Sequence, residues 1–363
     1  MKWAWHIVTV AGIGIYLHGT FLVLIVFVLL SEWSVSRSVP AAIGGALFVT
    51  AIFATVVLHE LGHALTAMRY GIRTRDITLL PIGGVARLER TPEVPRQELW
   101  VALAGPAVNM AIAAVCFGVL TVLPGLEPAL TLDPRGGGVV NRFMTVNLVI
   151  AAFNLLPAFP MDGGRALRAL LAERMDYVKA TETAATLGQG LALIFGLIGL
   201  LANPFLLFIA LFVWMGASGE ASTVVLRTAL AGIPVDRAMI TEFHALEADR
   251  PIRDAADLLL AGSQQDFPIV DHDRLVGVLA RASLMRALAH GGLEAPIRTA
   301  MTTEFETADA REMLEPAFQR LQACHCPLVP VLRAGRLVGI LTSENVGEFV
   351  MIRNAIAPRS HSS

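Results

Sequence analysis

Stretches without a charged side chain alternate with short charged segments along the first two thirds of the chain. Asp, Glu, Lys and Arg are absent from residues 3–31, 38–59, 99–126, 143–161 and 183–219. A helix that crosses a bilayer needs about 20 apolar residues. The last stretch is therefore long enough for two crossings, and Asn203-Pro204 provides the break between them. The pattern predicts six transmembrane helices, at 17–36, 41–68, 98–123, 142–159, 184–201 and 204–223.

The ends of these helices indicate an orientation. Residues 3–16 mix polar and β-branched residues, which predicts an amphipathic segment at the membrane interface. The apolar run that follows is too long for a signal peptide and lacks a small-residue cleavage pattern. Lys and Arg number 12 on the side of the N-terminus and 3 on the other side. This bias predicts a multi-pass protein of the plasma membrane with a cytoplasmic N-terminus and, after six crossings, a cytoplasmic C-terminal domain.

Composition supports a division into two parts. Of the 363 residues, 55% are hydrophobic and only 16% are charged, which a single soluble domain cannot bury. Residues 1–225 hold 27 of the 58 charged residues, whereas the shorter remainder holds 31. A net charge of −2 gives no indication of a nucleic-acid partner, and three cysteines exclude a disulfide scaffold. We expect a membrane domain at 1–225, a linker at 226–232 and a folded domain at 233–352, followed by a flexible tail at 353–363.

The C-terminal part contains an internal repeat. Ala238-Met239 recurs as Ala300-Met301, and Arg274–Leu279 recurs as Arg336–Leu341, both after 62 positions. A third block, Phe267–Val270, recurs in the same order as Cys326–Val329. Each unit reads as helix, strand, turn, strand and helix, so we expect two α/β repeats at about 233–292 and 295–352.

The most informative motif is His59-Glu60-Leu61-Gly62-His63. On a helix, positions i and i+4 share a face, so both imidazoles can reach one metal ion. Zinc suits imidazole nitrogen, and Glu60 is placed to act on a water molecule. Ionisable residues inside a membrane span are costly without partners, which favours a functional site. The alternative is a pair of buried histidines that are hydrogen-bonded to neighbouring groups.

A catalytic zinc site needs a third protein ligand. The acidic candidate is Asp162, which follows Asn154-Leu155-Leu156-Pro157 and precedes Gly163-Gly164. The prolines and glycines of this segment must break the helix. Irregular backbone at membrane depth is tolerated where it is buried in protein or lines a water-filled cavity. The alternative is that Asp162 only caps the helix that follows.

These motifs resemble those of the site-2 protease family of intramembrane zinc metalloproteases, in the bacterial subgroup with a C-terminal pair of CBS domains. His18, Gly83-Gly84 and the segment Ala104–Asn109 add to the resemblance. It implies that His59, His63 and Asp162 are the zinc ligands and that Glu60 is the catalytic base. It also implies that Asn154 helps to hold the substrate strand or the developing oxyanion.

Three further positions are open to a structural interpretation. We expect His18 to be a buried or interfacial residue rather than a catalytic one. Gly105-Pro106 and Asn109 are interpreted mainly as packing and helix-start features, with Asn109 able to bond across helices. We expect residues 72–90 to form two strands with a Gly-Gly turn, which could pair with an extended substrate segment. The alternative for this loop is an amphipathic connector.

The family resemblance also implies partners. The substrates would be single-pass membrane proteins such as anti-sigma factors or signalling precursors. CBS pairs commonly bind adenine nucleotides and can dimerise. Their Gly-x-x-Thr/Ser-x-x-Asp pattern survives in part as Thr342 and Asn345 in the second repeat, while Ala280 and Ser283 replace it in the first. We expect Cys324-His325-Cys326 to be reduced packing residues rather than a metal site.

The fold predicted is thus a polytopic α-helical membrane protein with a C-terminal α/β tandem CBS domain. The predicted function is an intramembrane zinc endopeptidase under CBS control. A CBS-regulated channel or transporter is the alternative; it would explain the broken helix near Asn154 but not the histidine motif together with Asp162.

Overall fold

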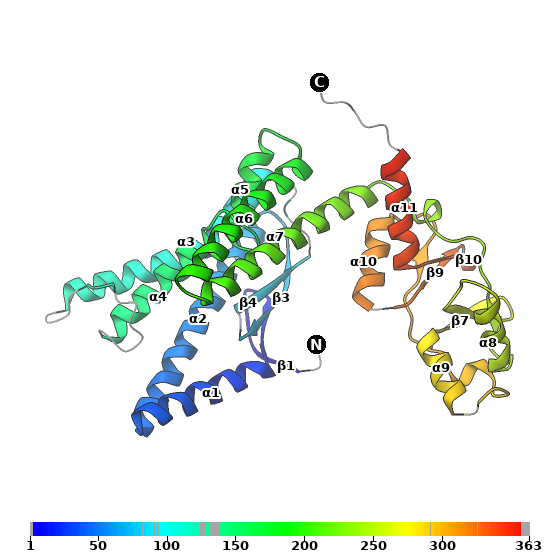
Figure 1. The fold of residues 1–363 in the computed structure, drawn as a ribbon, viewed down its shortest axis with the longest axis horizontal. Helices are drawn as coiled ribbons and strands as arrows, with labels where there is room; N and C mark the ends of the chain where they lie inside the picture. Colours follow the sequence, from blue (N-terminus) through cyan, green and yellow to red (C-terminus); the bar gives the residue numbers. More distant parts are fainter. Residues whose placement is uncertain are drawn as a thin grey trace. The chain divides into compact units, whose positions relative to one another are not determined.

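The chain divides into two compact units, an N-terminal unit Met1–Val224 and a C-terminal unit Val225–Ser363. The computed structural model describes residues 3–81, 83–89, 92, 94–123, 128–130, 138–290, 292–324 and 326–356 (Figure 1).

Apolar helices make up most of the N-terminal unit. Five helices in the described part of the chain are long and apolar enough to cross a membrane: α1 (Gly19–Ser36), α2 (Val39–Arg69), α3 (Pro95–Val122), α6 (Tyr177–Leu201) and α7 (Phe205–Leu230). The break predicted at Asn203-Pro204 separates α6 from α7, and Asn203 Oδ1 accepts a hydrogen bond from the Phe205 N–H. Five of the six predicted spans therefore correspond to long helices.

The remaining predicted span, 142–159, corresponds to α4 (Val139–Asn154), which has only 16 residues. It ends five residues before the predicted boundary at 159 because prolines follow at 157 and 160. The chain then turns into α5 (Asp162–Ala172), a short amphipathic helix. That α4 crosses the membrane stays a prediction.

A four-stranded sheet packs against α2. Its strands are β1 (Ala4–Val10), β2 (Ile13–His18), β3 (Thr74–Leu80) and β4 (Gly83–Leu88), in that order across the sheet. β2 and β3 are parallel, and the other two pairs are antiparallel. The strands expected at 72–90 are confirmed. Residues 3–16, predicted as an amphipathic interfacial segment, also form strands: Ile13 and Ile15 of β2 are buried against α2, whereas β1 is largely exposed and pairs with β2.

The C-terminal unit repeats one α/β motif twice. The first repeat contains β5 (Leu246–Glu247), α8 (Ile252–Ala261), β6 (Phe267–Asp271), β7 (Arg274–Leu279) and α9 (Arg281–Ala289). The second contains β8 (Ala308–Asp309), α10 (Leu314–Cys324), β9 (Val329–Arg333), β10 (Arg336–Leu341) and α11 (Ser343–Ile356). A single-turn 3-10 helix precedes each repeat, η1 (Val235–Arg237) and η2 (Ile297–Thr299).

The two repeats exchange backbone bridges at matching positions. Ile240 pairs with Ile340, and Thr302 pairs with Val278. Each bridge joins the start of one repeat to the last strand of the other, and the equivalent residues lie 62 positions apart, as the sequence blocks do. This symmetry confirms the predicted α/β repeat.

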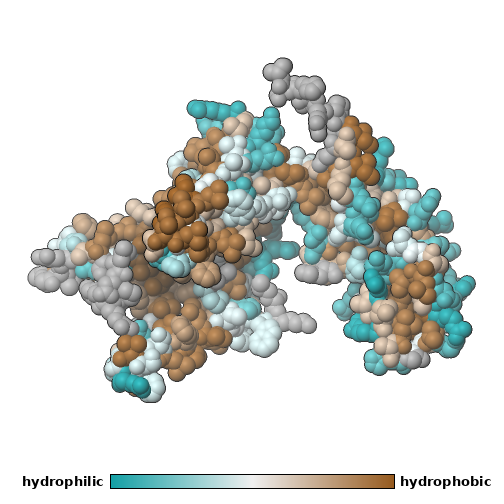
Figure 2. Space-filling view, viewed as in Figure 1, coloured by the Kyte–Doolittle hydropathy of each residue, from teal (hydrophilic) through white to brown (hydrophobic). Residues whose placement is uncertain are grey.

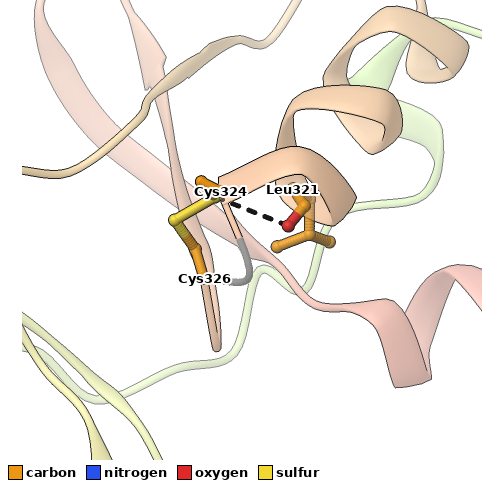
Figure 3. Close-up of a disulfide and its surroundings, with 3 residues drawn as sticks. All are labelled: Leu321, Cys324 and Cys326. Atoms are coloured by element: carbon orange, nitrogen blue, oxygen red, sulfur yellow. Dashed lines mark hydrogen bonds between the residues drawn. A yellow bond between two sulfur atoms is a disulfide. The ribbon is translucent and has the colours of Figure 1, made fainter. Parts of the chain in front are cut away.

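The cysteine pair at the end of α10 differs from its prediction. Cys324 and Cys326 form a disulfide, and Cys324 Sγ also lies 3.4 Å from the Leu321 carbonyl oxygen (Figure 3). The two Cα atoms are 5.1 Å apart, within the range that a disulfide can bridge. The expectation of two reduced thiols is therefore wrong, whereas Cys116 is free and buried. His325 lies outside the described residues.

The surfaces of the two units differ in polarity. Hydrophobic colour covers broad areas over the helices of the N-terminal unit, while hydrophilic colour predominates over much of the C-terminal unit (Figure 2). On α6 and α7, Leu200, Leu201 and Phe208 are more than two thirds exposed. Such exposed apolar side chains are stable in lipid but not in water, which is consistent with a membrane-embedded unit.

Candidate metal centre

Helix α2 presents two histidines on one buried face. His59 and His63 are each 5% exposed, and their ring centroids lie 4.8 Å apart. Leu61 and Ala64 lie on the other side of the helix and pack against the sheet, so these hydrophobic positions fix the direction in which the imidazoles point, away from the sheet. The helical spacing predicted from the sequence therefore produces the expected pair.

The carboxylate of Asp162 meets this pair from a different helix. Its Oδ2 atom lies 3.1 Å from His59 Nε2 and 3.0 Å from His63 Nε2. The two Nε2 atoms are themselves 3.1 Å apart. Asp162 begins α5 without a side-chain capping bond, since Met161 is the cap residue. Its carboxylate is thus directed to the histidines, and the capping alternative is not observed.

The other ring nitrogen of each histidine, Nδ1, forms a hydrogen bond with a protein acceptor. His59 Nδ1 lies 2.6 Å from Asn109 Oδ1, and His63 Nδ1 lies 2.6 Å from the Val101 carbonyl oxygen. Both partners are acceptors at these atoms, so each Nδ1 carries the proton. Asn109 is oriented in turn by a bond from its Nδ2 to Asn147 Oδ1 on α4. Asn109 and Asn147 are fully buried and link three helices beneath the site.

The convergence of three donor atoms has a chemical consequence. With Nδ1 protonated, a neutral imidazole directs a lone pair from Nε2, so two nitrogens and one carboxylate oxygen face a common point. A proton on one nitrogen relieves only part of this repulsion, whereas a cation satisfies all three atoms. Ligands about 2.1 Å from tetrahedral zinc lie about 3.4 Å from one another, close to the separations found here. The residues therefore fit a zinc ion.

Small residues bring α3 close to this centre. A Cβ atom placed on Gly105 would lie 2.2 Å from His63 Nε2 and 2.6 Å from His59 Nε2. On α2, a Cβ on Gly62 would lie 2.9 Å from the Ala104 carbonyl oxygen. Gly105, Pro106 and Asn109 lie inside α3, which begins at Pro95, so the helix-start interpretation is wrong. The packing interpretation of Gly105 and the expected bond of Asn109 across helices are confirmed, whereas their contact with the histidines was not predicted from the sequence.

Glu60 lies next to the histidines, partly exposed, and faces β4. A Cβ atom on Gly84 would lie 2.7 Å from Glu60 Cγ, which places the start of β4 directly against this side chain. The motif Gly83-Gly84 therefore allows a strand to approach the centre closely.

Asn154 and His18, two other residues singled out from the sequence, form hydrogen bonds with nearby backbone groups. The Asn154 amide donates to the Ile150 carbonyl oxygen within α4 at 3.0 Å. His18 is the N-cap of α1, where its Nδ1 accepts a bond from the Thr20 N–H. His18 thus has a structural contact of the kind expected from the sequence.

In the C-terminal unit, Thr342 and Asn345 contact each other. Asn345 Oδ1 accepts a bond from the Thr342 N–H at 2.7 Å, and its Nδ2 donates to the Ala238 carbonyl oxygen. A cavity of about 400 Å³ lies instead beside the first repeat, where Ser283, Arg286 and His290 are among its lining residues.

Comparison with known proteins identifies the family. The model of peptidase family M50 matches residues 47–141 and 138–197. The zinc metalloprotease MJ0392 of Methanocaldococcus jannaschii is 32% identical over 349 residues, which are 95% of this chain and 96% of the relative. The chain belongs to peptidase family M50. The putative zinc metalloprotease Rip3 of Mycobacterium tuberculosis is 29% identical to this M50 protein, over 96% of this chain and 93% of the relative.

A solved structure and a second family model are also similar to parts of this chain. The solved structure of the site-2 protease from Methanocaldococcus jannaschii is 38% identical, with a TM-score of 0.44, over 60% of this chain and 95% of that chain. A CBS domain model matches residues 235–290. The protein is therefore a membrane-embedded zinc metalloendopeptidase of the site-2 protease type with a C-terminal CBS domain, and the resemblance inferred from its motifs is confirmed.

Proposed function

We propose that this M50 protein hydrolyses peptide bonds within or near transmembrane segments of other membrane proteins. The observation that carries the proposal is the meeting of His59, His63 and Asp162, whose donor atoms all lie within 4.8 Å of one another among buried groups. The two histidines belong to α2, one of the helices long and apolar enough to cross a membrane, which supports chemistry at membrane depth.

In this proposal, His59, His63 and Asp162 hold zinc, and Glu60 is the general base. When bound, zinc supplies a Lewis acid that polarises a carbonyl group and makes water nucleophilic near neutral pH. Glu60 accepts the proton of the attacking water and later delivers it to the leaving amine nitrogen. Asn109 and the Val101 carbonyl keep the two imidazoles in the tautomer that leaves each Nε2 lone pair available.

The substrate must reach this centre as an extended chain, because a helix hides its carbonyl groups in hydrogen bonds. β4 is an edge strand of the described sheet, and its first residues lie against Glu60. An extended segment added along β4 would run beside the catalytic base. Asn154 would contribute by holding this segment or the developing oxyanion, after its amide leaves the Ile150 carbonyl.

We propose, as the family resemblance implies, that the substrates are single-pass membrane proteins, such as anti-sigma factors or signalling precursors, in regulated intramembrane proteolysis. The test is co-expression of candidate substrates with the wild type, Glu60→Gln and the matched control Glu182→Gln, whose side chain is exposed on α6. We expect uncut precursor to accumulate only with Glu60→Gln. Equal cleavage by Glu60→Gln and the wild type would refute the role of Glu60.

We further propose that the CBS pair regulates the protease, through an adenine nucleotide and a homodimer. The chain leaves the N-terminal unit within α7, since the boundary at Val224 falls inside this helix. Because Asn345 is already bonded to Thr342 and Ala238, the cavity beside Ser283 and Arg286 is a second candidate for the nucleotide. Calorimetric titration with AMP distinguishes the two candidate sites. Asn345→Ala abolishes AMP binding if the nucleotide binds at Thr342 and Asn345, whereas Arg286→Ala abolishes it if the nucleotide binds in the cavity.

The proposed orientation has the N-terminus and the CBS unit in the cytoplasm, as the arginine distribution indicates. Accessibility labelling of single cysteines introduced at either end of the chain tests it. A channel or transporter receives no support from the site, because neither activity requires two imidazoles, a carboxylate and an adjacent glutamate to converge.

A further inference from the structure

A buried arginine lies on the helix that carries Asp162. Arg168 of α5 is 0% exposed and is the largest fully buried side chain among the described residues. Its Nε donates to Glu98 Oε1 on α3 at 2.9 Å, its Nη2 contacts the same oxygen, and its Nη1 donates to Glu220 Oε1 on α7 at 2.5 Å. The guanidinium also lies 5.0 Å from the ring centroids of Phe159 and Tyr177.

These contacts hold the segment on both sides of Asp162. Phe159 lies three residues before Asp162 and is 1% exposed, while Arg168 lies six residues after it. The stacking of Arg168 on Phe159 therefore joins the loop that enters α5 to the middle of α5. Asp162 sits between these two anchored points.

Helix α7 supports the same segment from two positions one turn apart. A Cβ atom on Gly216 would lie 2.4 Å from Pro160 Cδ, so α7 is in close contact with the loop. Four residues later, Glu220 meets Arg168. Positions i and i+4 share a helix face, so one face of α7 contacts both Pro160 and Arg168.

Asp162 needs such support because α5 has only 11 residues. The two imidazoles belong to α2, and their positions are set by bonds to Asn109 and Val101 on α3. A metal ion requires the carboxylate within a few tenths of an ångström of its place relative to these nitrogens. The bond from Arg168 to Glu98 ties α5 to α3, the helix that orients both histidines. Glu98 is 3% exposed, and its Oε2 has no hydrogen-bond partner among the described residues.

From this arrangement we infer that Arg168 is a positioning residue for the metal centre, which holds the Asp162 carboxylate against the two imidazoles through Glu98, Glu220 and Phe159. The inference rests on the proposed roles of His59, His63 and Asp162 as metal ligands. Arg168 does not touch the metal or the substrate; it fixes α5 relative to α3 and α7. Removal of a group that orients a metal ligand typically lowers metal affinity 10- to 100-fold.

The test uses the full-length protein in detergent, freed of metal and titrated with Co²⁺ in competition with a chelator. Co²⁺ reports both the affinity and, through its visible spectrum, the set of ligand atoms. The variants are Arg168→Met, Arg168→Lys, Glu98→Gln and Glu220→Gln. Arg174→Met is the matched control, because Arg174 follows α5 and is exposed.

We expect Arg168→Met to weaken Co²⁺ binding at least about 10-fold and to change the spectrum towards that of Asp162→Ala. Arg168→Lys keeps the charge but loses the fork of donors, so it should recover part of the affinity. Arg174→Met should match the wild type. A merely structural role would lower thermal stability without changing the spectrum of the protein that remains folded.

Wild-type affinity and spectrum in Arg168→Met would overturn the inference. If Arg168→Met does not fold, Glu98→Gln and Glu220→Gln decide, since both keep side-chain size: unchanged affinity and spectrum in both would also overturn it. Failure of the proposed metal site can be distinguished from failure of the inference about Arg168. If the metal site is wrong, Co²⁺ binding by the wild type does not depend on His59.

Discussion

A single methyl group added to α3 should remove the metal centre. In Gly105→Ala the new Cβ atom would lie 2.2 Å from His63 Nε2 and 2.6 Å from His59 Nε2. Nonbonded heavy atoms prefer about 3.5 Å, so at least one imidazole or the helix must move by about 1.3 Å. Metal–ligand distances tolerate only about 0.2 Å of error. We therefore expect the purified variant to contain little zinc and to cleave substrate at least about 100-fold more slowly.

The matched control is Gly118→Ala on the same helix. Among the described residues outside its own helix backbone, none lies within 4 Å of a Cβ atom placed on Gly118. Alanine is also preferred over glycine in a helix by about 0.8–1.0 kcal/mol. This variant should keep its zinc and its activity. The assay combines metal analysis of each purified protein with cleavage of a co-expressed substrate. One zinc per chain and wild-type cleavage in Gly105→Ala would refute the packing argument.

Three other changes test separate parts of the structure. Asn109→Ala removes the acceptor of the His59 Nδ1–H group, and we expect zinc affinity to fall about 10- to 100-fold in competition with a chelator; an unchanged affinity would contradict this role. Asn345→Ala leaves the Thr342 N–H and the Ala238 carbonyl without their partner, and should lower the unfolding free energy of the C-terminal unit by about 1–3 kcal/mol in denaturant titrations, a loss that Glu344→Ala should not reproduce. Removal of zinc by a chelator should stop cleavage and lower Tm, and added Zn²⁺ should restore both; activity that survives complete removal would exclude a zinc mechanism.

The sequence predicted those parts of the molecule whose signals are local. Two histidines four residues apart must share a helix face, and a charge-free stretch of 20 residues indicates a span whatever its neighbours are. The repeat at 62 positions likewise required only the comparison of short blocks. Asp162 could be predicted because it is an acidic residue near the end of another predicted span.

Other features depend on contacts that no local pattern records. Asn109 supports His59 only because α3 packs on α2 with a particular rotation, which Gly62 and Gly105 allow. Ile13 and Ile15 of the strand-forming residues 3–16 meet Ile77 and α2, whereas the local mixture of polar and β-branched residues indicated only an amphipathic segment. The Cys324–Cys326 disulfide depends on how the chain turns after α10.

The same close packing that builds the centre also limits what can be changed around it. Gly62 and Gly105 let α2 and α3 approach until backbone and imidazole atoms touch, and this approach brings Val101 and Asn109 within reach of the histidines. In lipid there is little hydrophobic force to hold two helices together, so close contact and buried hydrogen bonds must do so. The interactions that orient the imidazoles are therefore also those that join α2 to α3. It follows that substitution of Asn109, whose side chain accepts the His59 bond, should alter metal affinity and helix packing together. Glu60→Gln adds no bulk and should separate catalysis from both.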